Sequence, residues 1–245
     1  MARLKIKRIM LKVFQVYFLE SQKKTLLEGF EPFFNKNGNI FLENQVMIDL
    51  FKKHENDNFE WFGVFSHKVS QKLLCDFSYD LLDTKSIQCS DFDILAPKMQ
   101  SYPWSNIQKP HNPRIQHARK EYPGMWQCID LILKKLNIPD KNNGNLLNSN
   151  ANIIYTNSFL CKKNVMRDYI DKILQPTINL IKYDNEVKQL ALQTSDYQAT
   201  YEFPQNLSKS SGLTTWPHAP FILERMINVY FLTYNKKTAF ILYQS

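Results

Sequence analysis

Three polar residues, Ser66, His67 and Lys68, end an apolar run that begins at Trp61 (WFGVFSHK). The run has the length and composition of a buried strand. A lysine and a hydroxyl at the end of a strand can bind phosphate, the lysine as a point charge and the serine through a hydrogen bond. Ser66 and Lys68 share one side of the strand, while His67 follows Phe65 on the other. The alternative is that Ser66 begins a turn before the next helix.

Asp91 and Asp93 (DFD) are candidate ligands of a metal ion. Carboxylate oxygens suit hard divalent cations, so the pair favours Mn²⁺ or Mg²⁺. A metal-binding pair of this kind is expected to close a strand, whereas this one opens a strand. The alternative is therefore that Asp91 caps or solvates the start of the strand.

Amides and hydroxyls gather before and within a predicted strand around residue 155. They are Asn148, Ser149, Asn150, Asn152, Asn157 and Ser158. Amides both donate and accept hydrogen bonds, which suits the hydroxyls of a sugar. The same residues also suit turns, so both interpretations stay open.

A fourth candidate group surrounds the helix predicted over Phe221 to Leu232. His218 precedes the helix between two prolines, and Glu224 and Arg225 are consecutive in its first turns. A charged pair on an otherwise apolar helix is unfavourable unless each charge finds a partner. Either the two residues form a structural ion pair, or His218 and Glu224 line a pocket in which Arg225 holds a phosphate or a carboxylate.

The elements that must position these residues alternate along the chain. Apolar patterns predict strands over residues 13–18, 60–66, 91–97 and 151–163 and in the final KKTAFILYQ. They predict helices over 41–54, 70–82, 165–192 and 221–232, and over 112–136 on either side of Pro123 and Gly124. The helical pattern of 165–192 is expected to break near Pro176. We therefore expect one α/β domain, residues 1–245, with a mixed sheet and helices on both faces. Ligands bind at strand ends in such sheets, so the Ser66 corner and the polar loops 138–152 and 193–217 are the expected walls of one site.

The formal net charge is +8 and the sequence pI is about 9.2, which favours anionic partners. The sequence contains no helix-turn-helix, zinc-finger or RNA-recognition signature, so nucleic acid is not an expected partner. The basic start MARLKIKRIMLK favours contact with an anionic membrane surface. No apolar run approaches the roughly 20 residues that span a bilayer. We expect a cytoplasmic protein that contacts the inner membrane face peripherally.

Several of these segments resemble a known family. VFQVYFLESQKKTLLEGFEPFFN, WFGVFSHKV, DFDILAP, NSNANIIYTNSFLCKK and HAPFILERMINVY resemble segments of an uncharacterised bacterial family from surface-polysaccharide gene clusters. The resemblance covers nearly the whole chain. The chain is also distantly similar to a family of GT-A-like glycosyltransferases, whose motifs map onto Ser66 to Lys68 and onto Phe221 to Phe231.

The resemblance implies a GT-A-like fold, that of nucleotide-diphospho-sugar transferases, and a role in building capsule or lipopolysaccharide glycans. The first hypothesis is a glycosyltransferase that uses a nucleotide sugar and a glycan or lipid-linked acceptor. Lys68 or Arg225 would stabilise the departing diphosphate if no Mn²⁺ or Mg²⁺ does so, and Glu224, His218 or Asp196 would act as base. The alternative hypothesis is a non-catalytic binding or scaffolding subunit of a polysaccharide assembly complex with the same fold.

Overall fold

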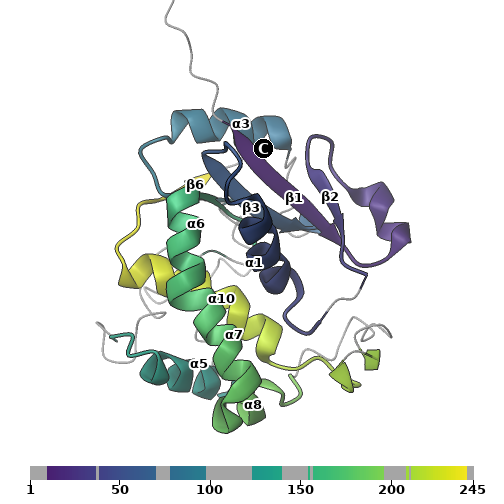
Figure 1. Cartoon of the computed structure of the whole chain (residues 1–245), viewed down its shortest axis with the longest axis vertical. Coiled ribbons are helices and arrows are strands. Elements are labelled where there is room, and N and C mark those ends of the chain that lie inside the picture. The colour runs from purple at the N-terminus through teal and green to yellow at the C-terminus, as the bar shows by residue number, and fades with distance from the viewer. Residues whose placement is uncertain are drawn as a thin grey trace, which may run out of the picture.

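A computed structural model describes residues 10–36, 39–69, 78–97, 123–139, 154, 157–195, 208–209 and 211–241. Within these ranges, six strands form one sheet in the order β2-β1-β3-β5-β4-β6 (Figure 1). They are β1 (Leu11–Tyr17), β2 (Glu31–Phe34), β3 (Trp61–Ser66), β4 (Ile94–Pro97), β5 (Leu160–Lys162) and β6 (Thr238–Ile241). Only β5 runs against its neighbours, β3 and β4. We call the end of the sheet where the other five strands finish its carboxyl end, and the opposite one its amino end.

Helices cover both faces of this sheet, as the sequence predicts. Val13 and Phe65 point to the face that packs on α3 (Tyr79–Gln88). Phe14 and Phe62 point to the other face, because side chains alternate along each strand. The core on that face includes residues of α1 (Leu42–His54), α5 (Pro123–Lys135), α6 (Lys163–Tyr169), the π-helical η3 (Ile170–Leu174), α7 (Gln175–Tyr183), α8 (Asn185–Ala191) and α10 (Ala219–Thr233). A short 3₁₀ helix, η1 (Glu20–Thr25), follows β1.

The predicted interruption near Pro176 is wrong. The chain is helical from α6 through η3 into α7, and Pro176 is the second residue of α7. A π-helical segment changes the hydrogen-bond spacing just before the proline, where the helix must accommodate a residue without an amide hydrogen. The break comes instead at Asp184, whose side chain caps α8 by accepting the Val187 N–H at 3.1 Å.

Other predicted elements differ in extent. Of the strand expected over residues 151–163, the described residues form β5, while 151–153 and 155–156 lie outside them. β2 lies in a segment for which the sequence predicted no strand. Most of the helix expected over 70–82, and the part of 112–136 before α5, lie outside the described residues. No helix among the described residues is long and apolar enough to cross a membrane.

Asp168 joins α6 to α10 and to the turn before β6. It accepts a hydrogen bond from the Tyr230 hydroxyl at 2.7 Å, and its carboxylate lies 2.7 Å from Lys172 Nζ and 3.8 Å from Lys236 Nζ. Burial raises the pKa of Asp168, but the hydrogen bonds from Lys172 and Tyr230 and the charges of Lys172 and Lys236 outweigh burial and hold the pKa below its usual value. The charged carboxylate therefore stabilises the contact between the two helices.

We expect Asp168→Asn to lower the free energy of unfolding by about 1 kcal/mol at neutral pH, because the ion pairs are lost. A carboxyl with a lowered folded-state pKa stabilises the protein above its unfolded pKa, and this contribution disappears as the pH falls through the folded pKa. The deficit of the variant should therefore vanish below the ordinary aspartate value of 3.8. Urea titrations across this pH range measure it. The exposed Asp171→Asn is the control, and a deficit that stays constant with pH would contradict this account.

Candidate functional site

β3 ends at the carboxyl end of the sheet in a corner formed by Ser66, His67 and Lys68, which we call the β3 corner. Its backbone is fixed, because the His67 N–H donates to Val16 O at 2.9 Å and Gln15 Nε2 donates to Ser66 O at 3.3 Å. Ser66 Oγ accepts the Lys68 N–H at 3.3 Å. This hydrogen bond agrees with the alternative prediction that Ser66 begins a turn. The hydroxyl keeps its own hydrogen to donate. The corner can thus form a turn and still present a donor and a cation.

Aromatic rings surround the β3 corner. Phe18 follows β1 and lies against His67, with ring centroids 6.3 Å apart. Tyr17 stacks on Phe34, the last residue of β2, at 5.0 Å. Gln22 Oε1 accepts two consecutive backbone N–H groups after β1, at 2.8 and 3.0 Å, and so fixes this turn. Phe18 and Phe34 are half-buried, which leaves ring surface on which a planar group can stack.

Asn157 and Ser158 reach the same end of the sheet because β5 runs against its neighbours. The register pairs Trp61 with Lys162, and continuing it towards the carboxyl end brings Asn157 level with Ser66. Asn157 is only 6% exposed, and its Oδ1 accepts no hydrogen bond. Buried side-chain amides are normally paired. Asn157 is therefore a candidate contact for a ligand at the β3 corner.

α1 also begins at the carboxyl end, because it follows β2, and its first turn carries buried Glu43 and Asn44. Asn44 is 1% exposed, and neither its Oδ1 nor its Nδ2 has a hydrogen-bond partner. Neither residue was singled out from the sequence, although a signal is present. Asn44 precedes the buried Met47, Ile48 and Phe51 at helical spacing, so its amide occupies a position on the core-facing stripe.

His218, Glu224 and Arg225 lie in and just before α10. His218 is buried, its N–H donates to Gln193 O at 3.1 Å, and a Cβ on Gly124 at the start of α5 would lie 3.1 Å from its Nε2. Arg225 Nη1 lies 3.6 Å from Glu224 Oε2, and the two side chains are 17% and 18% exposed. This geometry matches the ion-pair interpretation. Within the described residues, no contact joins these three side chains to the β3 corner.

Asp91 and Asp93 precede β4, so they lie at the amino end, opposite the β3 corner. Asp93 Oδ2 accepts the Lys237 N–H at 3.0 Å, and the Asp93 N–H donates to Lys237 O at 2.7 Å, which organises the start of β6. Asp91 is exposed, as a residue that solvates the start of a strand would be. In the part of the chain that the structure describes, no three His, Cys, Asp or Glu side chains are grouped to hold a metal ion. The described donors therefore do not fit an Mn²⁺ or Mg²⁺ site at the β3 corner.

The structure thus brings Ser66, His67, Lys68 and Asn157 to one end of the sheet and adds Asn44 to them. It does not bring Asp91 and Asp93 to that end. The predicted residues Asn150, Asn152 and Asp196 lie outside the described residues. Their roles stay predictions.

Asn157 and Asn228 allow a matched test of whether an unpaired amide serves the fold. Asn228 Oδ1 accepts the Ile154 N–H at 2.7 Å, and its Nδ2 donates to Ile154 O at 2.9 Å. We expect Asn228→Leu to lower the free energy of unfolding by about 2–3 kcal/mol, because two buried hydrogen bonds are lost. Asn157→Leu should leave it unchanged or raise it by about 1 kcal/mol, because it removes an unpaired buried oxygen. Urea unfolding measures both, and an equal loss would show that Asn157 supports the fold.

Comparison with known proteins adds information on the fold. No protein-family model and no curated protein matches the chain. Among solved structures, the chain is similar to the apo structure of WbbM, a bifunctional glycosyltransferase, with a TM-score of 0.50 and 16% sequence identity. The similarity covers 96% of this chain and 45% of the WbbM chain, so the chain spans less than half the length of that protein. At this identity the likeness shows the fold alone, an α/β fold with a mixed sheet.

Proposed function

We propose that the protein is a glycosyltransferase that takes a sugar from a nucleotide-activated donor, and that the donor binds at the carboxyl end of the sheet. The observation that carries the proposal is the buried, unpaired Oδ1 of Asn157, which precedes the antiparallel β5 at the carboxyl end of the sheet, in a fold similar to that of WbbM. Ligands of open α/β sheets bind at the carboxyl ends of the strands, where this amide lies.

The chemistry of the carboxyl end suits the parts of a nucleotide sugar. Lys68 and the Ser66 hydroxyl provide a cation and a donor for the diphosphate. The amides of Asn157 and Asn44 can donate to and accept from sugar hydroxyls. The half-buried ring of Phe18 provides a surface for the nucleobase.

The reaction needs an accepting base and a stabilised leaving group. The bond from the anomeric carbon to the donor phosphate breaks, the acceptor oxygen bonds to that carbon, and the acceptor proton passes to Glu224, His218 or Asp196. Lys68 or Arg225 stabilises the negative charge that develops on the departing diphosphate. No step passes through a metal ion, because the described donors do not fit one.

The sequence resemblance to proteins of surface-polysaccharide gene clusters is what supports a proposal for the acceptor and the cellular role. We infer that the acceptor is a growing capsule or lipopolysaccharide glycan, or its lipid-linked precursor. A lipid-linked acceptor lies at a membrane, and the basic residues of MARLKIKRIMLK would favour contact with its anionic surface.

Glu224→Gln distinguishes a catalytic role from a structural one. If Glu224 is the base, we expect turnover to fall by about 10²-fold or more, while the free energy of unfolding changes by less than about 0.5 kcal/mol. The exposed Glu28→Gln is the control and should change neither. A lowered unfolding midpoint without a selective loss of transfer would make Glu224 structural and favour the non-catalytic binding or scaffolding subunit.

Nucleoside diphosphates and nucleotide sugars should raise the melting temperature of the protein, because a ligand that binds only the native state stabilises it. At a ligand concentration of about 100 times Kd, the rise should be roughly 5–10 °C for a chain of this size. Lys68→Gln should reduce the rise, whereas the exposed Lys24→Gln should not. The screen is run with and without Mn²⁺ to test for a metal requirement. No shift with any donor would contradict the transferase proposal.

A further inference from the structure

Gln15 is a buried polar side chain within β1, in the run VFQVYF, whose other residues are apolar or aromatic. It is 1% exposed and pairs in the ladder with Phe65, which lies in an apolar cluster on the same face of the sheet. A buried amide is unfavourable unless its polar atoms are hydrogen-bonded. Gln15 Oε1 accepts the Leu27 N–H at 2.7 Å, and Nε2 donates to Ser66 O at 3.3 Å. These two hydrogen bonds distinguish Gln15 from an apolar residue of similar size.

The two hydrogen bonds of Gln15 join segments that are far apart in the sequence. Leu27 follows η1, at the far end of the loop that begins with Phe18 after β1. Gln22 fixes the near end of this loop, because its Oε1 accepts the Phe18 N–H at 2.8 Å. Ser66 is the first residue of the β3 corner. The amide of Gln15 therefore ties the loop that carries Phe18 to the β3 corner.

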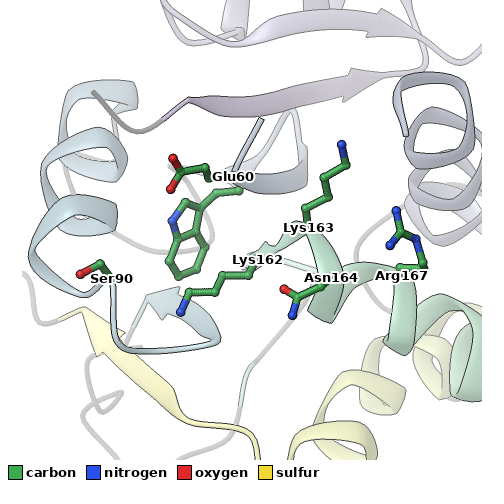
Figure 2. A pocket seen from close by; sticks show the side chains of 7 residues that line it. Glu60, Ser90, Lys162, Lys163, Asn164 and Arg167 are labelled. Carbon is green, nitrogen blue, oxygen red and sulfur yellow. The ribbon is translucent and has the colours of Figure 1, made fainter. Parts of the chain in front are cut away.

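The amino end of the sheet also carries cations, but they do not converge. A pocket of about 330 Å³ is lined there by Lys162, Lys163 and Arg167, among other residues. The side chains of Lys162 and Arg167 extend to opposite sides of it (Figure 2). Arg167 Nε lies 2.7 Å from Glu55 Oε1, and Lys163 Nζ donates to Asp57 O at 2.7 Å. We therefore expect a diphosphate to bind at the carboxyl end and not in this pocket.

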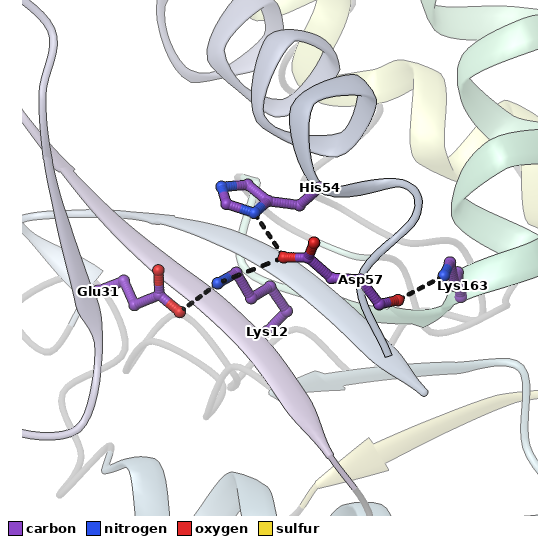
Figure 3. A network of polar contacts seen from close by, with 5 residues as sticks. All are labelled: Lys12, Glu31, His54, Asp57 and Lys163. Atoms are coloured by element: carbon purple, nitrogen blue, oxygen red, sulfur yellow. Dashed lines mark hydrogen bonds and ion pairs between the residues drawn. The ribbon is translucent and has the colours of Figure 1, made fainter. Parts of the chain in front are cut away.

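A polar network anchors β1 at the amino end (Figure 3). Lys12 Nζ lies 2.8 Å from Glu31 Oε1 at the start of β2 and 3.9 Å from Asp57 Oδ2. His54 Nδ1 lies 2.7 Å from the same Asp57 oxygen, which ties the last residue of α1 to β1. This network does not depend on Gln15. Loss of the Gln15 amide should therefore change the carboxyl end locally, while the other end of β1 stays in place.

We propose that Gln15 is a positioning residue of the donor site, which holds the Phe18 ring at the correct distance from Ser66 and Lys68. This inference rests on the proposed function, in which Phe18 meets the nucleobase while Ser66 and Lys68 meet the diphosphate. A ligand that spans both parts binds tightly only when their separation already matches its length. Gln15 itself contacts no ligand and acts through the two backbone groups that its amide holds.

A ligand that contacts the β3 corner alone should be insensitive to Gln15. The corner keeps a second tie to β1, because the His67 N–H donates to Val16 O at 2.9 Å. Pyrophosphate has no base to place on Phe18, so only the corner matters for its binding. Nucleoside diphosphates need both parts. The ratio of the two affinities therefore reports the separation that Gln15 sets, whereas a general loss of stability would not change it.

The test measures by calorimetry the binding of pyrophosphate and of UDP, GDP, ADP, CDP and dTDP, of which the tightest binder is then used. Gln15→Met has a similar size but cannot make the two hydrogen bonds. It should weaken the nucleoside diphosphate by about tenfold or more and pyrophosphate by less than about twofold. Lys68→Gln should weaken both ligands. Ile173→Ala, which leaves a cavity in the core at η3, should lower the melting temperature and change neither affinity.

Gln15→Glu provides a rescue that depends on pH. When protonated, its carboxyl can donate to Ser66 O and accept the Leu27 N–H, as the amide does. When ionised, it can only accept. Burial favours the neutral form, so nucleoside diphosphate affinity relative to wild type should recover as the pH falls from about 8 to about 5. Pyrophosphate affinity relative to wild type should stay constant. If Gln15→Met does not fold, this variant decides the question.

The outcomes separate this role of Gln15 from the proposed function. If wild-type protein binds neither pyrophosphate nor any nucleoside diphosphate, both are overturned. The positioning role alone is overturned if Gln15→Met weakens both ligands equally or neither, if Ile173→Ala reproduces the selective loss, or if Gln15→Glu shows no recovery. It is also overturned if wild-type protein binds a nucleoside diphosphate but not pyrophosphate, or if Lys68→Gln retains pyrophosphate binding, because the β3 corner would then not hold the diphosphate.

Discussion

The direction of β5 is the constraint on which both ends of the sheet depend. This strand is antiparallel to β3 and β4, so it begins where they finish. A Cβ on Gly63 would lie 2.7 Å from Leu160 Cδ2 and 2.9 Å from Phe159 O, so a larger residue could not stay in β3 without moving β5. The close approach brings Asn157 level with the β3 corner at one end. At the other end it brings the β5–α6 junction against Trp61.

Buried polar groups at the carboxyl end are of two kinds, those with hydrogen-bond partners and those without. Gln15 is 1% exposed, and its amide donates to Ser66 O and accepts the Leu27 N–H at 2.7 Å. This paired amide fixes the β3 corner, and its loss would leave two backbone groups unsatisfied, at a cost of about 1–3 kcal/mol each. Asn157 Oδ1 and both polar atoms of Asn44 have no such partner. An unpaired buried group opposes folding, and under the proposed function a ligand would supply the missing partner.

Much of the fold could be predicted because its main elements have clear periodicity. The apolar runs of β1 and β3 and the helical stripes of α1 and α10 are local patterns, so their positions follow from the chain alone. The β3 corner can also be predicted from a local pattern, because polar residues that follow an apolar run mark a strand end. Asn44 shows the limit of this approach. It lies on the same stripe as Met47 and Ile48, and only attention to a polar residue at a core position would have found it.

Direction and pairing could not be predicted, because they are set by contacts between distant segments. β5 has only three residues, and nothing in LCK states that it runs against β3. The π-helical segment before Pro176 was likewise not predicted, and its Ile170, Ile173 and Leu174 lie in the core. In the sequence, Lys162 and Lys163 therefore cannot be told apart from the other lysines of this basic chain. Because β5 is antiparallel to β3, Lys162 and Lys163 follow its buried centre and lie at the amino end, beside Trp61. Arg167 lies about one helical turn after Lys163 in α6. The position of Lys162 and Lys163 at the amino end is thus a direct consequence of the strand direction that also places Asn157 at the carboxyl end.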